Sequence, residues 1–132
     1  MEPPALATKS YLRRMITTAI AVFIGGGLGS LARWGVGRSM SDWAHPHAAL
    51  VATLAANALA CLVLGFFLSK APNARQVAWI AIGFCGGFST FSTFSQEVLT
   101  LFKTGQWVTA LCYAVASMAI GLAALYMGSR LT

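Results

Sequence analysis

Four long apolar stretches constrain what this chain can fold into more than any other feature. They cover about residues 15–35, 48–68, 77–102 and 107–127. A bilayer hydrocarbon core about 30 Å thick is crossed by roughly 20 helical residues, so each stretch is long enough to span it. Helices satisfy their own backbone polar groups in lipid. We therefore predict an all-α integral membrane protein, a single domain over residues 1–132 with four transmembrane helices, multi-pass in the cell membrane.

Charged residues are scarce and lie at the ends of these stretches. The sequence is 58% hydrophobic and 9% charged, whereas a soluble domain carries about 25% charged residues. The formal net charge is +6, but the Lys and Arg side chains flank apolar stretches, where they can snorkel to lipid headgroups. We therefore expect membrane lipid around the protein and no binding of nucleic acid. The larger share of positive charge on the side of the N-terminus favours a cytoplasmic N-terminus.

The third stretch contains a run that is unsuited to an uninterrupted membrane helix. Gly86 and Gly87 are followed by five hydroxyl residues within positions 89–95, and Gly lowers helix propensity by about 1 kcal/mol relative to Ala. The run predicts a helix break in mid-membrane that releases backbone carbonyls. Such carbonyls are tolerated where protein, water or an ion satisfies them, and broken transporter helices coordinate Na⁺ in this way. The alternative is a purely structural kink.

Isolated polar residues also interrupt the other spans. Thr53 and Asn57 share one face of the second span, and Asn57 either bonds a neighbouring helix or lines a polar path. Arg33, near the end of the first span, either snorkels to the interface or supplies positive charge at a pore mouth. Tyr113 and Ser117 form a thin polar stripe on the fourth span.

Glu97 is the only carboxylate in a predicted span. It could be a proton-coupled site, a partner of Arg33, or a hydrogen-bond acceptor near the membrane boundary. Phe91 and Phe94 are three residues apart, so their rings can share a helix face. Ring edges turned into a path would suit an anion and ring faces a cation, although packing against lipid or the core is the simpler explanation of the pair taken alone.

Small residues recur at helical spacing in the first span. Gly25 and Gly29 form a GxxxG pair, and Gly26 with Ser30 forms a second pair on the adjacent face. Such pairs let helix backbones approach closely in lipid. We predict that they pack against another helix.

Several classes of protein fit these residues poorly. A small four-helix multidrug exporter needs a mid-span carboxylate in the first span, which has Arg33 instead. A non-conducting membrane subunit accounts for the small-residue faces but not for the hydroxyl-rich run. His45 and His47 lie in a loop, and no nucleophile and base occur at a recognisable spacing, so we do not expect an enzyme.

The run Gly-Gly-Phe-Ser-Thr-Phe-Ser-Thr-Phe-Ser at residues 86–95 closely resembles the Fluc, or CrcB, family of fluoride channels. The similarity extends over nearly the whole chain, including the glycine-rich first span that ends in Arg33-Trp34 and the polar pairs of the second and fourth spans. It implies a fluoride-specific channel that exports fluoride passively and so lowers intracellular fluoride and its toxicity.

The resemblance also implies an assembly and a set of site residues. Two antiparallel subunits of dual topology would form two fluoride pathways around a structural Na⁺, which is required but not transported. The carbonyls of Gly86 and Ser89 from both subunits would hold the Na⁺. Phe91 and Phe94 would turn ring edges to the pathway, and Arg33 would place positive charge at its vestibule. The other implied lining residues are Asn57, Thr53, Ser92, Thr93, Ser95, Tyr113 and Ser117, with Glu97 beside them.

The sequence departs from the family pattern at three positions. Ser89 replaces the usual threonine, Ala52 stands where a glycine commonly precedes Thr53, and Gly121 falls where a further serine extends the polar stripe. The charge asymmetry between the two sides also exceeds what dual topology needs. That asymmetry leaves a heterodimer with an oppositely oriented homologue as the alternative to the homodimer that we expect.

Overall fold

The computed structural model describes residues 4–42 and 45–131, and all regular structure in these residues is helical. Three helices are continuous: α1 (Pro4–Met40), α2 (Ala48–Leu68) and α6 (Trp107–Arg130). Between α2 and α6 the chain forms α3 (Ala74–Gln76), a π-helical segment η1 (Val77–Cys85), α4 (Gly86–Phe88) and α5 (Phe91–Lys103).

Four helical spans in the described residues are long and apolar enough to cross a membrane. They are Thr8–Met40, Ala48–Leu68, Ala74–Lys103 and Trp107–Arg130. The prediction of an all-α, multi-pass membrane protein with four spanning helices is confirmed.

Three of the four helical spans are longer than the apolar stretches from which they were predicted. Helix α2 has the bounds expected from the sequence, but α1 begins eleven residues before and ends five residues after the expected span of 15–35. With 37 residues, α1 is about 55 Å long at 1.5 Å per residue. No proline interrupts α1 near the lipid boundary. The proline of this helix, Pro4, lies in the first turn, where proline is tolerated.

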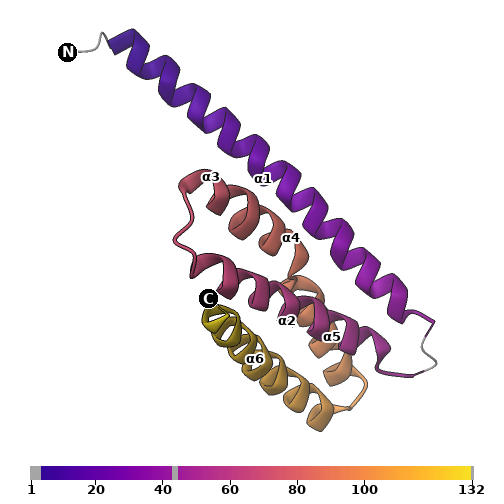
Figure 1. Ribbon diagram of the computed structural model, residues 1–132. Coiled ribbons are helices and arrows are strands. Elements are labelled where there is room, and N and C mark those ends of the chain that lie inside the picture. The colour runs from indigo at the N-terminus through magenta and orange to yellow at the C-terminus, as the bar shows by residue number, and fades with distance from the viewer. Residues whose placement is uncertain (1–3, 43–44, 132) are drawn as a thin grey trace.

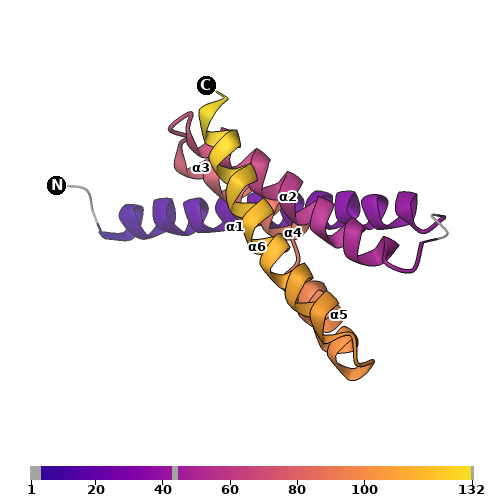
Figure 2. The same cartoon turned by 90° about the horizontal axis from the view of Figure 1, so that it is seen from below.

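The most extensive helix contacts are those of α1 with the first half of the third span and of α2 with α6. Helix α1 lies against η1 and α4, whereas α6 lies against α2 and α5 (Figure 1). The N-terminal part of α1 projects beyond the rest of the bundle, and α1 and α6 cross at a steep angle when the molecule is seen from below (Figure 2).

Glycines allow the paired helices to touch backbone to backbone. A Cβ atom on Gly25 would overlap the carbonyl oxygen of Trp79, and one on Gly29 would overlap that of Phe84. On the other pair of helices, a Cβ atom on Gly65 would overlap the carbonyl oxygen of Leu125. The close packing predicted for Gly25 and Gly29 is confirmed, because no larger residue fits at either position.

Candidate functional site

The helical path through the third span is interrupted at Ser89 and Thr90. Both residues have extended backbone, with ψ of 156° at Ser89 and 112° at Thr90. The Thr90 N–H donates to Oδ1 of Asn57 at 2.7 Å, and Nδ2 of Asn57 donates to the Thr90 carbonyl at 3.3 Å. One carboxamide thus satisfies both backbone groups of Thr90, and the Gly86 carbonyl loses the donor that a continuous helix would give it.

Thr90 also begins the helix that follows the interruption. Its hydroxyl oxygen accepts a hydrogen bond from the backbone N–H of Thr93 at 3.2 Å, which caps α5. The same hydroxyl donates to the Thr93 hydroxyl at 3.0 Å. Thr90 was not among the site residues expected from the sequence, although a threonine followed by a helical run is a signal for a helix start.

Glu97 accepts two short hydrogen bonds from neighbouring helices. The Thr53 hydroxyl of α2 donates to Oε1 at 2.7 Å, and the Tyr113 hydroxyl of α6 donates to Oε2 at 2.6 Å. Within residues 4–42 and 45–131 the one ion pair is Arg38–Asp42, so Arg33 does not pair with Glu97. Of the three roles considered for Glu97, the structure shows that of hydrogen-bond acceptor.

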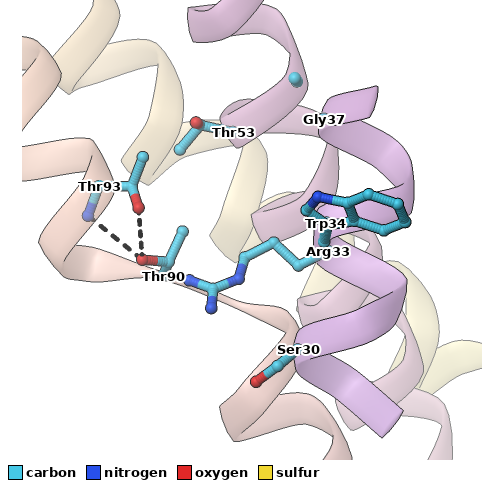
Figure 3. Close-up of a pocket in the computed structure, with 8 residues that line it drawn as sticks. Ser30, Arg33, Trp34, Gly37, Thr53, Thr90 and Thr93 are labelled. Carbon is cyan, nitrogen blue, oxygen red and sulfur yellow. Dashed lines mark hydrogen bonds between the residues drawn. The ribbon is translucent and has the colours of Figure 1, made fainter. Parts of the chain in front are cut away.

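Arg33 points from α1 into a cavity beside the interruption. Figure 3 shows its guanidinium directed towards Thr90, with Thr53 and Thr93 on the far wall. The cavity has a volume of about 340 Å³, and Ser30, Trp34, Gly37 and Ala52 complete its lining. A charged side chain that was expected near the end of its span therefore lies next to three threonines and the break in the third span.

Two further cavities share lining residues with this site and reach the loop after α1. One of about 470 Å³ shares Gly37, Ala52, Thr53 and Thr93 with the Arg33 cavity and reaches His45. The other, of about 620 Å³, reaches His47 and Gln106. Both are lined by Thr93 and Glu97, so polar side chains continue from the loop to the interruption.

The opposite side of the interruption opens on the surface of the single chain. A cavity of about 220 Å³ is lined there by polar and aromatic side chains: Asn57, Ser89, Thr90, Phe91, Phe94 and Ser117, with Cys61 and Met118. The Phe91 side chain is 80% exposed. The Phe94 ring lies 5.7 Å from that of Phe91 and 5.3 Å from that of Tyr113. The Ser117 hydroxyl is buried and has no hydrogen-bond partner among the described residues.

The expected site residues therefore fall into two groups. Arg33, Thr53, Thr93 and Glu97 line the cavities on the α1 side, whereas Asn57, Ser89, Phe91, Phe94 and Ser117 line the cavity on the α6 side. Tyr113 joins the groups, because its hydroxyl donates to Glu97 and its ring contacts the Phe94 ring at a tilt. Gly86, Ser92 and Ser95 lie on the exposed surface of the third span, where the Ser95 hydroxyl donates to the Phe91 carbonyl at 2.8 Å.

Four apolar helices, the third interrupted between cavities that contain polar side chains, define a small polytopic membrane protein. Residues 20–129 match the family described as CrcB-like protein, Camphor Resistance (CrcB). The chain belongs to this family, in agreement with the resemblance expected from its sequence.

Named relatives support the same assignment. The chain is 42% identical to the fluoride-specific ion channel FluC of Proteus mirabilis, over 86% of this chain and 90% of the relative. It is 40% identical to FluC of Pseudomonas syringae pv. tomato, over 89% and 98% of the two chains. It is 38% identical to FluC of Gloeobacter violaceus, over 86% and 94%. These relatives are named as ion channels, which agrees with the expectation that the chain is not an enzyme.

Proposed function

We propose that this chain is the subunit of a fluoride-specific channel, through which fluoride leaves the cell passively and its intracellular concentration falls. Membership of a family whose relatives are named fluoride channels supports the proposal. The observation that carries it is the Arg33 cavity, which ends at the interrupted span. A guanidinium keeps its charge at neutral pH, so it raises the local concentration of anions in a low-dielectric cleft.

Free hydrogen-bond donors support the choice of the side chains that would contact fluoride. A channel must replace the water around a small, strongly hydrated ion with donors of its own. The Thr93 hydroxyl accepts from Thr90 and keeps its own hydrogen. The Ser117 hydroxyl has no partner in the described residues, and the Asn57 amide has a second hydrogen beyond the one given to Thr90. We assign these three groups to the fluoride route.

Thr53 and Tyr113 have a different part in this proposal. Each hydroxyl has a single hydrogen, and both donate it to Glu97. Their hydrogen bonds to Glu97 therefore hold α5 against α2 and α6. They become donors to fluoride when the Glu97 carboxylate turns away from them.

A second copy of the chain would complete the route. The cavity of Phe91 and Ser117 opens on the surface of the single chain, and the polar residues Ser92 and Ser95 of the same helix are exposed. Polar groups that face lipid cost free energy unless a partner covers them. We propose an antiparallel homodimer with two pathways, in which Phe91 and Phe94 present ring edges to the ion.

The interrupted span also supports a structural Na⁺ at the centre of that dimer. The Gly86 carbonyl is released by the Asn57–Thr90 bonds, and Gly86 is exposed. The Ser89 carbonyl follows in extended backbone. Carbonyl oxygens of broken helices are ligands for Na⁺, so these groups fit the ion. The same two carbonyls of an antiparallel copy would complete the set, and the ion would hold the subunits together without being transported.

Fluoride efflux from liposomes that contain the purified chain tests the function. A fluoride electrode should record rapid release, with chloride retained in a parallel measurement. Arg33→Gln should slow the release, whereas Arg38→Gln should not, because Arg38 belongs to the same helix but pairs with Asp42 outside the cavity. Equal rates for the two variants would remove Arg33 from the route, and absence of release from the parent would refute a homodimeric channel.

Labelling from the two sides of a membrane tests the dimer. Lys103→Cys in a Cys112→Ala background places an accessible thiol at the end of α5, since Cys61 and Cys85 lie within spans and are partly or fully buried. An impermeant thiol reagent should modify about half of the chains from each side if the topology is dual. Modification from one side alone would favour the oppositely oriented homologue as partner.

A further inference from the structure

A groove between α1 and the start of the third span lies outside the proposed route. It has a volume of about 420 Å³ and seven lining residues: Thr17, Ile20, Ala21 and Ile24 of α1 with Arg75, Gln76 and Trp79. The four α1 residues are spaced as one helix face. Ile20, Ile24 and Trp79 are 52%, 49% and 42% exposed, so the groove has an uncovered apolar floor.

Arginine side chains lie at one end of this groove. Arg75 belongs to the lining itself and precedes the first residue of η1 by two positions. Arg13 is one helical turn before Thr17 and continues the same face of α1. The Thr17 hydroxyl donates to the Arg13 carbonyl at 3.0 Å, which fixes that turn. The lining of the groove is therefore almost wholly apolar, and the basic residues Arg13 and Arg75 mark the end at which Thr17 lies.

The surroundings of that end are also basic. Lys70 follows α2, with its ammonium 5.1 Å from the centre of the Phe66 ring. Arg130 ends α6, with its guanidinium 5.0 Å from the centre of the Tyr126 ring. Aromatic rings with cations beside them are typical of the membrane interface. These two residues, with Lys9, Arg13, Arg14 and Arg75, have no carboxylate partner among the described residues.

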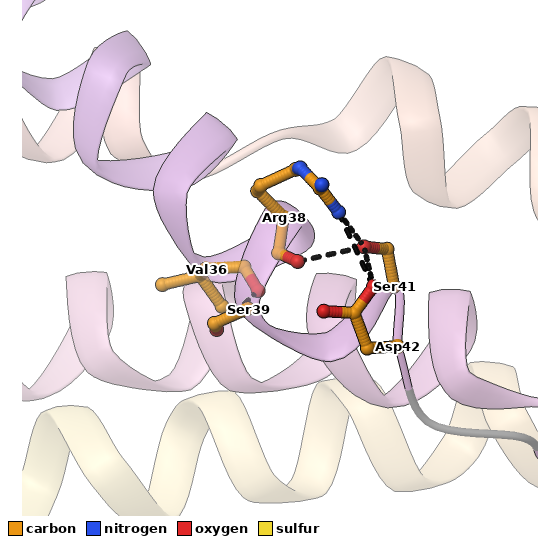
Figure 4. A network of polar contacts seen from close by, with 5 residues as sticks. All are labelled: Val36, Arg38, Ser39, Ser41 and Asp42. Carbon is orange, nitrogen blue, oxygen red and sulfur yellow. Dashed lines mark hydrogen bonds and ion pairs between the residues drawn. The ribbon is translucent and has the colours of Figure 1, made fainter.

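The other end of the bundle differs in this respect. There, Arg38 binds Asp42 at 3.3 Å and also donates to the Ser41 hydroxyl (Figure 4). That arginine has a counter-charge within its own helix end. Arg13 and Arg75 have no such counter-charge among the described residues.

We propose that this groove is a seat for an anionic phospholipid. The phosphate contacts Arg75 and Arg13, and an acyl chain lies along Ile20, Ile24 and Trp79. Charge complementarity selects an anionic lipid over a zwitterionic one, because a headgroup with a net negative charge offsets part of the charge of the two arginines and a zwitterionic headgroup does not. A second antiparallel copy fits the groove less well, since it would bring its Arg38 and Lys103 end towards Arg13 and Arg75. The seat does not depend on whether the chain conducts fluoride.

Native mass spectrometry of the purified full chain with phosphatidylglycerol or phosphatidylcholine tests the charge requirement. The parent should retain phosphatidylglycerol preferentially. The double variant Arg13→Gln/Arg75→Gln should lose that preference by about fivefold per arginine, which corresponds to the ~1 kcal/mol typical of a basic residue at an anionic surface. The matched control Arg38→Gln/Lys103→Gln removes the same charge from the other end and should bind as the parent does. An equal loss in both variants, or no preference in the parent, would overturn the proposal.

Quenching of tryptophan fluorescence tests whether the acyl chain reaches the groove. Lipids brominated on the acyl chain quench an indole that they touch. The part of the quenching that disappears in Trp79→Phe should be larger with brominated phosphatidylglycerol than with brominated phosphatidylcholine. Equal quenching by both lipids would show an unselective lipid surface, and absence of quenching at Trp79 would show that protein covers the groove. Either result would refute the seat.

Discussion

Replacement of Asn57 by aspartate changes one atom of the interrupted span. The Asn57 side chain now accepts from the Thr90 N–H at 2.7 Å and donates to the Thr90 carbonyl at 3.3 Å. An aspartate keeps the acceptor but loses the donor, and it turns a second negative oxygen towards the Thr90 carbonyl. It also takes a donor away from the proposed fluoride route and puts an anion in its place.

The lost hydrogen bond to the Thr90 carbonyl sets the expected fall in fluoride efflux. A buried carbonyl without a partner costs about 1–3 kcal/mol, and each 1.4 kcal/mol is a factor of ten in population. The ratio of the extended backbone at Ser89 and Thr90 to competing conformations should therefore fall by about 5- to 150-fold, before repulsion of fluoride by the new charge is added. We expect Asn57→Asp to lower fluoride efflux by at least about fivefold at neutral pH.

The assay is the release of fluoride from liposomes, with protein-free liposomes as background at each pH. Efflux by Asn57→Asp should recover in part on acidification, because a protonated carboxyl can again donate to the Thr90 carbonyl. Asn73→Asp is the matched control, since Asn73 caps a short helix outside the apolar stretches and aspartate caps equally well. If folded Asn57→Asp conducts at the parent rate at neutral pH, both the Asn57–Thr90 account and the place of Asn57 in the route are wrong.

Three other perturbations have expected outcomes. Phe91→Ile and Phe94→Ile should each slow efflux and leave the dimer intact on size-exclusion chromatography; conduction at the parent rate by both would refute the ring-edge role. Gly25→Ala should lower the midpoint of thermal unfolding, because the added methyl overlaps the Trp79 carbonyl and overpacking costs about 1–3 kcal/mol, whereas Gly27→Ala meets no atom within 4 Å and should not. Replacement of all Na⁺ by N-methylglucamine should stop efflux and weaken the dimer in detergent; unchanged flux would exclude a required Na⁺.

Much of the fold could be predicted because lipid limits the alternatives. Apolar length alone located the four spans, and for α2 it also gave the helix ends. For α1 it did not, because hydropathy marks where lipid ends and not where the backbone stops being helical. Residues 4–14 of α1 satisfy their own hydrogen bonds beyond the apolar stretch, so the helix continues past it.

The candidate site was predictable in its residue types but not in its pairings. The hydroxyl-rich run indicated where the third span changes, and the residues of the second span were expected to be polar partners or lining. That Asn57 bonds the backbone of Thr90 depends on the rotation of α2 against a segment 33 positions away. The three roles open for Glu97 likewise differed only in which helix faces met, and these are set by packing of the whole bundle.

The hydrogen-bond inventory separates residues that hold the structure from residues that can serve an ion. Thr90, Thr53 and Tyr113 have given their hydrogens to protein acceptors. A spare donor in an apolar bundle costs about 1–3 kcal/mol if it stays unpaired. The buried Ser117 hydroxyl has no partner at hydrogen-bond distance in the described residues, so an acceptor from outside the single chain would stabilise it. Its cavity opens towards the exposed Phe91, so such an acceptor, an anion or a second subunit, would approach from the face where the proposed route and the proposed dimer interface meet.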